Sequence, residues 1–243
     1  MYPILFETSS FLIYSQSVLM IIAFVAGVIV ALHEGERFGY SAKALIDLIL
    51  WGFLASFIGA RFLFIVIDKQ SISFPLDKNP LSQIFNGGFS FHGGLVAGGL
   101  VIVTIARYRQ IAFWRLADAL APGLAVAMLF MRIGCLLNGC DYGVVSSVPW
   151  AVPLYGDFRH PIQLYEGLGN FALMFGLMRL NRKPLPPGCV CGIYLFLSSC
   201  LRVAVDIYRD DPARFLGMTI PQYIAIGIAL IAGAGVLIRM RQQ

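Results

Sequence analysis

The sequence predicts an all-α, polytopic membrane protein that forms one transmembrane domain over residues 1–243. Hydrophobic residues make up 58% of the chain, charged residues make up 13%, and the mean hydropathy is +0.78. About a quarter of the residues of a soluble domain are charged. The apolar runs are longer than barrel strands and lack their alternating period, which favours helices.

Seven apolar segments are each expected to form a spanning helix, because about 20 apolar residues cross the hydrocarbon core. The first belongs to an uncharged run from Thr8 to Leu32, and the third contains the run GGLVAGGL, whose glycines allow close helix packing. In chain order the expected spans are 12–32, 45–67, 91–106, 116–137, 162–179, 189–208 and 218–238.

The basic residues between the spans predict the orientation, because cytoplasmic loops of membrane proteins are rich in Lys and Arg. One set of alternating segments holds ten basic residues and the other holds five. With seven spans, this places the N-terminus outside and the C-terminus inside. The net charge of +5 is scattered at helix ends, so a nucleic acid is not an expected partner.

Three arginines, Arg61, Arg132 and Arg202, lie within expected spans, where a guanidinium needs a partner or a watery cavity. If they converge, they form an anion site, because guanidinium binds phosphate through a planar fork of donors. Alternatively, each pairs with a local carboxylate. The available carboxylates are Asp47, Asp118, Glu166 and Asp206.

Several segments are expected at the outer face. The loop 68–90 mixes Phe, Leu and Ile with few charges, which is typical of an arm in the membrane interface. Four further segments lie on the outer side or just inside it: SFHGGL (90–95), RIGCLLNGCDYG (132–143), RHPIQLYEG (159–167) and LRVAVDIYR (201–209). The head group of a phospholipid would sit at that depth.

His92 stands at the mouth of the third span. An imidazole titrates near neutral pH, so His92 is a candidate general base. Gly93 and Gly94 would let an acyl glycerol approach the backbone closely. Alternatively, His92 is a helix-terminal histidine that bonds a carbonyl or a water.

These four segments, in this order, resemble the prolipoprotein diacylglyceryl transferase family over nearly the whole chain. The family's His-Gly-Gly segment matches SFHGGL, its Arg-x-Gly…Asn-Gly…Gly signature matches RIGCLLNGCDYG, and RHPIQLYE matches almost letter for letter. The resemblance implies catalytic roles for His92, Arg132 and Arg202. It implies substrate binding by Arg61, Gly93, Gly94, Asn138, Gly139, Gly143, His160, Gln163, Tyr165, Glu166, Asp206 and Arg209.

The resemblance also implies a fold and a reaction. The fold has seven transmembrane helices, an interfacial arm and a small periplasmic head, in the inner membrane of a bacterial cell. The diacylglyceryl group of phosphatidylglycerol moves to the cysteine thiol of a lipobox in a prolipoprotein signal peptide. A thioether forms and glycerol phosphate leaves. No metal or soluble cofactor is expected.

The chemistry of that reaction agrees with the residue types. A thiol must lose its proton before it attacks carbon, which calls for a base such as His92. The leaving group is a phosphate ester, and Arg132 and Arg202 would stabilise its charge as the bond breaks.

The sequence departs from the family at several matched positions. Cys135 replaces an asparagine, Cys140 replaces the glutamate of an Asn-Gly-Glu step, and Val144 replaces an arginine. In the first span, Gln16 and Ser17 replace a tyrosine and a glycine. The anion-binding arginines are kept, whereas some groups that position substrates are altered.

Cys135 and Cys140 lie near the outer, oxidising face. They can form a disulfide if this stretch is not one continuous helix and the geometry permits it. The alternative, which we favour from sequence, is a pair of small buried thiols, since free cysteine packs as an apolar residue. Cys189 and Cys191 are only a weak indication of a metal site.

Other functions stay open from the sequence. A paralogue could use the same phospholipid with another acceptor. A non-catalytic membrane protein could retain the phospholipid site. A membrane thiol-redox or metal protein could use Cys135 and Cys140.

Overall fold

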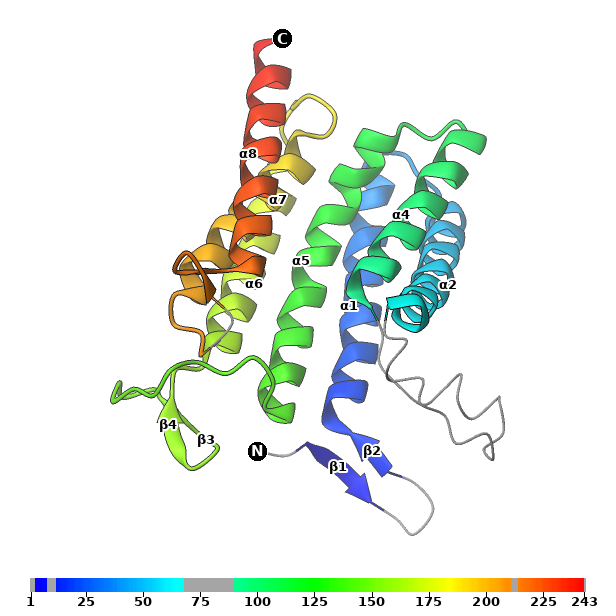
Figure 1. The fold of residues 1–243 in the computed structure, drawn as a ribbon. Coiled ribbons are helices and arrows are strands. Elements are labelled where there is room, and N and C mark those ends of the chain that lie inside the picture. The colour runs from blue at the N-terminus through cyan, green and yellow to red at the C-terminus, as the bar shows by residue number, and fades with distance from the viewer. Residues whose placement is uncertain (1–2, 8–11, 68–89, 211–213, 243) are drawn as a thin grey trace. The chain divides into compact units, whose positions relative to one another are not determined.

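The computed structural model describes residues 3–7, 12–67, 90–210 and 214–242. Within these residues the chain forms seven helices and three two-stranded antiparallel hairpins (Figure 1). The chain divides into two compact units. The first comprises Met1–Gly39 with Trp114–Gln243, and the second comprises Tyr40–Phe113. Almost all of the expected interfacial arm, residues 68–89, lies outside the described residues.

Each expected span overlaps one helix over most of its length. The helices are α1 (Ser15–Arg37), α2 (Ala42–Ile67), α4 (Phe91–Tyr108), α5 (Phe113–Asn138), α6 (Ile162–Leu180), α7 (Cys189–Asp206) and α8 (Ile220–Arg241). In the described part of the chain, α1, α2, α5, α7 and α8 are long and apolar enough to cross a membrane. That α4 and α6 also cross it stays a prediction.

The first expected span begins too early. Leu12–Tyr14 is strand β2, which pairs with β1 (Ile4–Glu7). Hydropathy alone does not distinguish an apolar strand from the first turn of an apolar helix, because the distinction depends on a pairing partner. The last expected span also begins too early, since Met218–Thr219 is strand β6 and pairs with β5 (Arg214–Phe215).

Thr219 starts α8 through a capping box. Its hydroxyl accepts from the Gln222 backbone N–H at 3.3 Å, and the Gln222 side chain accepts from the Thr219 N–H at 2.9 Å. Two helix-terminal N–H groups are thereby satisfied within one turn. The third hairpin, β3 (Val152–Leu154) with β4 (Asp157–Arg159), precedes α6.

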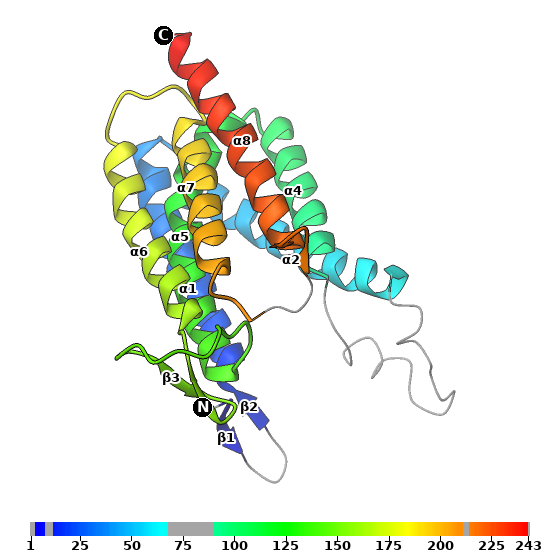
Figure 2. The same ribbon diagram turned by 60° about the vertical axis from the view of Figure 1, so that its left-hand side comes forward.

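In the first unit, α1, α5, α6, α7 and α8 run side by side (Figures 1 and 2). Helices α5, α6 and α7 share a buried core of Ala121, Ala125, Val126, Met174, Leu177, Val190 and Tyr194. Large apolar side chains such as Ile21 and Ile231 are instead exposed on the outer faces of the helices. Exposed apolar faces suit helices whose solvent is lipid.

The carboxylate of Asp118 is buried near the start of α5. It accepts the backbone N–H groups of Gly188 at 2.6 Å and Cys191 at 2.7 Å, which lie at the N-terminus of α7. Asp118 therefore caps α7 and is not a partner of an arginine within a span. Arg132 lies 14 residues further along α5, about 21 Å away at the helical rise.

Strand β1 and the C-terminal end of α8 lie at opposite ends of the first unit (Figure 1). The hairpin β1–β2, the C-terminal end of α5 and the hairpin β3–β4 lie at the same end. The polar residues of RIGCLLNGCDYG and RHPIQLYE consequently meet at one end of this unit.

The second unit is the closely packed pair α2 and α4. A Cβ on Gly59 would overlap the Cβ of Ala97 and lie 2.6 Å from the Gly93 carbonyl oxygen. A Cβ on Gly94 would lie 3.1 Å from the Ser56 carbonyl oxygen. Within this pair the glycines permit close contact between the two backbones, as the run GGLVAGGL predicts.

We expect Gly59→Ala to lower the free energy of unfolding by about 1–3 kcal/mol, because the new methyl overpacks the contact with α4. Gly99→Ala is the matched control, since its Cβ would meet nothing within 4 Å. The stability of each variant is measured as the midpoint of its thermal unfolding in detergent. Equal midpoints for the two variants would contradict this packing.

Candidate functional site

Helix α5 ends in a turn that the Asn-Gly pair explains. Gly139 has φ +81°, in the left-handed region that glycine adopts without cost. The Cys140 N–H donates to the Cys135 carbonyl at 3.0 Å, and the Gly139 N–H donates to the Leu136 carbonyl at 3.2 Å. These two bonds form the Schellman motif that ends many helices. Asn138 and Gly139 therefore reverse the chain at the end of α5.

This turn brings Cys140 back against α5, where Cys135 and Cys140 form a disulfide. Our interpretation of two buried free thiols is wrong, and the alternative of a disulfide is confirmed. The sequence condition for it, an interrupted helix, is met because α5 stops at Asn138. Cys189, Cys191 and Cys200 are free thiols.

Six charged side chains meet near the C-terminal end of α5. They form a closed ring, called the ring below, in which guanidinium and carboxylate groups alternate. In order around the ring they are Arg132, Glu166, Arg202, Asp206, Arg209 and Asp141. Three positive and three negative groups make the ring formally neutral.

Glu166 joins α5 and α7 to α6. Its Oε2 lies 2.5 Å from Arg132 Nε, and its Oε1 lies 2.9 Å from Arg202 Nη1. The Glu166 side chain is only 7% exposed. Burying a carboxylate is costly unless it is paired, and here each oxygen has its own guanidinium.

Asp206 and Asp141 complete the ring. Asp206 Oδ1 lies 3.2 Å from Arg202 Nε and 3.5 Å from Arg209 Nη1, and its side chain is fully buried. Asp141 Oδ2 lies 2.8 Å from Arg132 Nη1, and its Oδ1 accepts from Arg209 Nη2. The alternative that span arginines pair with carboxylates is confirmed for Arg132, which pairs with Glu166, and for Arg202, which pairs with Glu166 and Asp206.

Arg132 and Arg202 use Nε and Nη1 in these contacts. In the described part of the chain, the contacts that each guanidinium makes with the ring carboxylates are shortest at Nε or Nη1, not at Nη2. The side chains are 17% and 21% exposed. Nη2 carries two N–H donors, and in neither arginine is it the nearest nitrogen to a ring carboxylate.

A hydrogen-bonded aromatic group lies in the same unit. The Trp150 indole N–H donates to the Tyr165 hydroxyl at 2.6 Å, and that hydroxyl lies 3.0 Å from His160 Nδ1. The His160 ring also packs at a tilt of 44° against the Tyr208 ring, with centroids 4.9 Å apart. His160 and Tyr165 are thereby fixed in orientation.

Gln163 and Gly143 tie the loop to the helices. The Gln163 side chain donates to the Cys140 carbonyl at 2.7 Å. A Cβ on Gly143 would lie 2.5 Å from the His160 carbonyl oxygen, so the close approach of the two backbones requires glycine. Arg159 donates to the Gly143 carbonyl at 3.2 Å and pairs with Asp210 at 2.6 Å.

The second unit contains the remaining predicted residues. His92 lies in the first turn of α4, and its side chain is outside the described part of the structure. The Arg61 guanidinium carbon lies 5.5 Å from the centre of the Phe64 ring. Gly93 and Gly94 face α2 in the tight helix contact, and their contact with substrate stays a prediction. Asp47 pairs with Arg109 at 3.2 Å.

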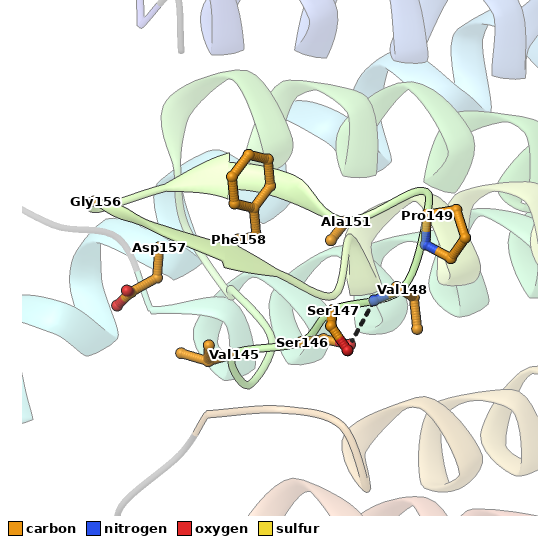
Figure 3. Close-up of a pocket in the computed structure, with 9 residues that line it drawn as sticks. All are labelled: Val145, Ser146, Ser147, Val148, Pro149, Ala151, Gly156, Asp157 and Phe158. Atoms are coloured by element: carbon orange, nitrogen blue, oxygen red, sulfur yellow. Dashed lines mark hydrogen bonds between the residues drawn. The ribbon is translucent and has the colours of Figure 1, made fainter.

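A surface hollow lies beside β3–β4, and none of the residues predicted as the site lines it. Figure 3 shows its lining of Val145, Ser146, Ser147, Val148, Pro149, Ala151, Gly156, Asp157 and Phe158. Among the described residues, no group of three or more His, Cys, Asp or Glu side chains is arranged to hold a metal.

Sequence reasoning missed Asp141, which belongs to the charged ring, and Trp150, which belongs to the hydrogen-bonded aromatic group. Neither follows from helical spacing, because both lie outside the helices. One signal was available for Asp141. Aspartate tolerates left-handed backbone better than most residues, and Asp141, with φ +54°, follows an Asn-Gly turn.

Comparison with known proteins assigns the chain to a family. Residues 3–239 match the family model for prolipoprotein diacylglyceryl transferase. The chain belongs to the prolipoprotein diacylglyceryl transferase family. The match covers both the charged ring and the α2–α4 pair.

Relatives named phosphatidylglycerol–prolipoprotein diacylglyceryl transferase agree with this. The one from Clostridium tetani is 26% identical over 239 residues, 95% of each chain. The one from Mannheimia succiniciproducens is 30% identical over 231 residues, 93% of this chain and 85% of the relative. The one from Idiomarina loihiensis is 33% identical over 214 residues, 84% and 79% of the two chains.

We expect a thiol-alkylating reagent to label three cysteines in the denatured, unreduced protein and five after reduction, because Cys135 and Cys140 are bonded. Mass spectrometry of the labelled peptides gives the count. Labelling of all five without reductant would contradict the disulfide.

Proposed function

We propose that this protein transfers the diacylglyceryl group of phosphatidylglycerol to the cysteine thiol of a lipobox in a prolipoprotein signal peptide. The family match over residues 3–239 supports the reaction. The ring is the observation that assigns named residues to the reaction. In it, one carboxylate, that of Glu166, pairs with both Arg132 and Arg202.

The reaction forms one bond and breaks one. The thiolate sulfur bonds to the terminal glyceryl carbon of the diacylglycerol. The bond between that carbon and the phosphate oxygen breaks, and its electron pair leaves with glycerol phosphate. The charge that grows on the leaving phosphate is the main electrostatic demand on the protein.

Arg132 and Arg202 are suited to that demand. Their Nη2 groups offer N–H donors, while Nε and Nη1 are fixed by Glu166, Asp206 and Asp141. Donors that are already oriented need not be ordered when the transition state forms. The neutrality of the ring also lowers the cost of keeping three guanidiniums at the end of a membrane helix bundle.

The thiol must lose its proton to react, and we propose His92 as the base on the match of its segment to the family. We also propose substrate contacts for Arg61, Gly93 and Gly94 in this segment and in α2. We propose substrate contacts for His160, Tyr165 and Gln163 as well, whose side chains have fixed partners.

We further propose that the enzyme lies in the bacterial inner membrane with seven spans, an interfacial arm and a small periplasmic head. Ten basic residues lie in one set of alternating segments between the spans and five lie in the other set. This difference supports a periplasmic N-terminus and a cytoplasmic C-terminus. The position of β1 and the C-terminal end of α8 at opposite ends of the first unit agrees with an odd number of crossings (Figure 1). On this orientation the ring faces the periplasm.

We expect Arg132→Gln and Arg202→Gln each to lower kcat by about 10²–10³-fold, the usual cost of losing a donor to a developing oxyanion. The assay combines purified protein, labelled phosphatidylglycerol and a lipobox peptide, and it measures the thioether product and the released glycerol phosphate. Arg109→Gln is the control, because Arg109 forms an exposed pair with Asp47 in the other unit.

The same assay separates the alternatives. Phosphatidylglycerol that binds without turnover in the wild-type protein would indicate a non-catalytic phospholipid-binding protein. Release of glycerol phosphate with no peptide product would indicate another acceptor. An unchanged rate in both arginine variants would contradict the assigned roles.

A further inference from the structure

Asp141 is the least predictable member of the ring. It lies between α5 and β3, outside any helix or strand, and its φ of +54° is unusual for a residue with a side chain. Its two carboxylate oxygens are divided between two arginines from different segments. Oδ2 accepts from Arg132 on α5, and Oδ1 accepts from Arg209, which follows α7.

The backbone on both sides of Asp141 is fixed. On one side, the Cys135–Cys140 disulfide and the Schellman turn tie the preceding residue to α5. On the other side, Gly143 forms an antiparallel bridge with Arg209. The Asp210 N–H also donates to the Tyr142 carbonyl at 3.2 Å. Asp141 therefore lies between two fixed points. The disulfide connects the residue before it to α5, and backbone contacts connect the residues after it to Arg209 and Asp210.

We propose that Asp141 is a positioning residue of the transfer reaction, and that the Cys135–Cys140 disulfide holds it in place. This inference rests on the proposed function. Asp141 does not contact the substrate in this proposal. It sets the distance and orientation of Arg132 relative to Arg209, and so the direction in which the remaining N–H donors of Arg132 point.

Asp141 and the disulfide lie where the sequence is expected to depart from the family pattern. By the resemblance of RIGCLLNGCDYG to the family signature, Cys140 stands at the position of a glutamate, and the next residue, Asp141, supplies a carboxylate. The Cys140 side chain points back to Cys135, three residues after Arg132 on α5. Residues three apart on a helix are neighbours, so the disulfide and the guanidinium lie on adjacent parts of one helix surface.

Asp141→Asn is the direct test. Asparagine adopts the left-handed backbone as readily as aspartate, so the turn is kept while the charge is removed. We expect kcat to fall tenfold or more, since misplacing a reacting group by about 1 Å costs up to about 10²-fold. The affinity for phosphatidylglycerol should not weaken, because the variant loses a negative charge beside two guanidiniums.

That separation of kcat from affinity distinguishes positioning from binding and from general instability. Binding is measured with phosphatidylglycerol in detergent micelles, and folding is measured by the thermal midpoint. Asp157→Asn is the matched control. Its carboxylate is 55% exposed and lies 3.7 Å from Arg159, outside the ring. It should leave kcat and affinity unchanged.

The disulfide is tested with a separate variant. That variant also tests whether the position of Asp141 affects kcat if Asp141→Asn fails to fold. Cys135→Ala/Cys140→Ala keeps Asp141 but releases its turn, and kcat should fall at least threefold without loss of phospholipid affinity. Cys200→Ala removes an exposed free thiol and is the control.

Active wild-type protein with an unchanged kcat in Asp141→Asn would overturn the role of Asp141. An unchanged kcat in the double cysteine variant would overturn the role of the disulfide. A fall in affinity that equals the fall in kcat would make Asp141 a binding residue and overturn positioning. Wild-type protein that forms no thioether would contradict the proposed function itself, and the inference with it.

Discussion

The constraint on which the first unit depends is electrostatic. Three guanidiniums at the end of an apolar helix bundle are unfavourable unless each is paired, and so are three carboxylates. The ring meets this requirement by giving every member two partners of opposite charge. The ends of α5, α6 and α7 must then converge, because the six groups come from those helices and the residues that follow them. Removing one carboxylate would leave two guanidiniums with a missing partner, so we expect the ring to behave as one unit.

In the proposed function, the same ring also supplies the chemistry of the site. Ion pairs within the protein orient the arginines before any substrate arrives, and the proposed function assigns the Nη2 groups of Arg132 and Arg202 to the phosphate. At the other end of the bundle, Asp118 serves a different purpose, because it caps α7 through backbone N–H groups. Helix α5 thus combines a structural carboxylate near its start with a candidate catalytic arginine near its end.

Much of this could be predicted from sequence. Seven helices follow from apolar length, and the arginines Arg132 and Arg202 stand out because charge is rare within spans. The helix pair of Arg202 and Asp206 follows from a spacing of four residues. The ring could not be predicted as a ring, because Asp141 and Arg209 approach through a backbone bridge between residues far apart in sequence. The disulfide depends on the left-handed turn at Gly139. The Asn-Gly pair indicates a turn, but it does not show that the turn brings Cys140 within bonding distance of Cys135. The strands β2 and β6 were missed because their apolar residues read as the first turn of a helix.

The most direct test of the central claim is an experimentally determined structure of the protein with bound phosphatidylglycerol in a lipid nanodisc. The claim is that the ring holds Arg132 and Arg202 so that their Nη2 groups bind the phosphate. The expected result is a phosphate within hydrogen-bond distance, about 2.7–3.2 Å, of both Nη2 groups, with Glu166 still between the two guanidiniums. A phosphate bound elsewhere, or a ring that is open in both the free and the bound protein, would contradict the claim.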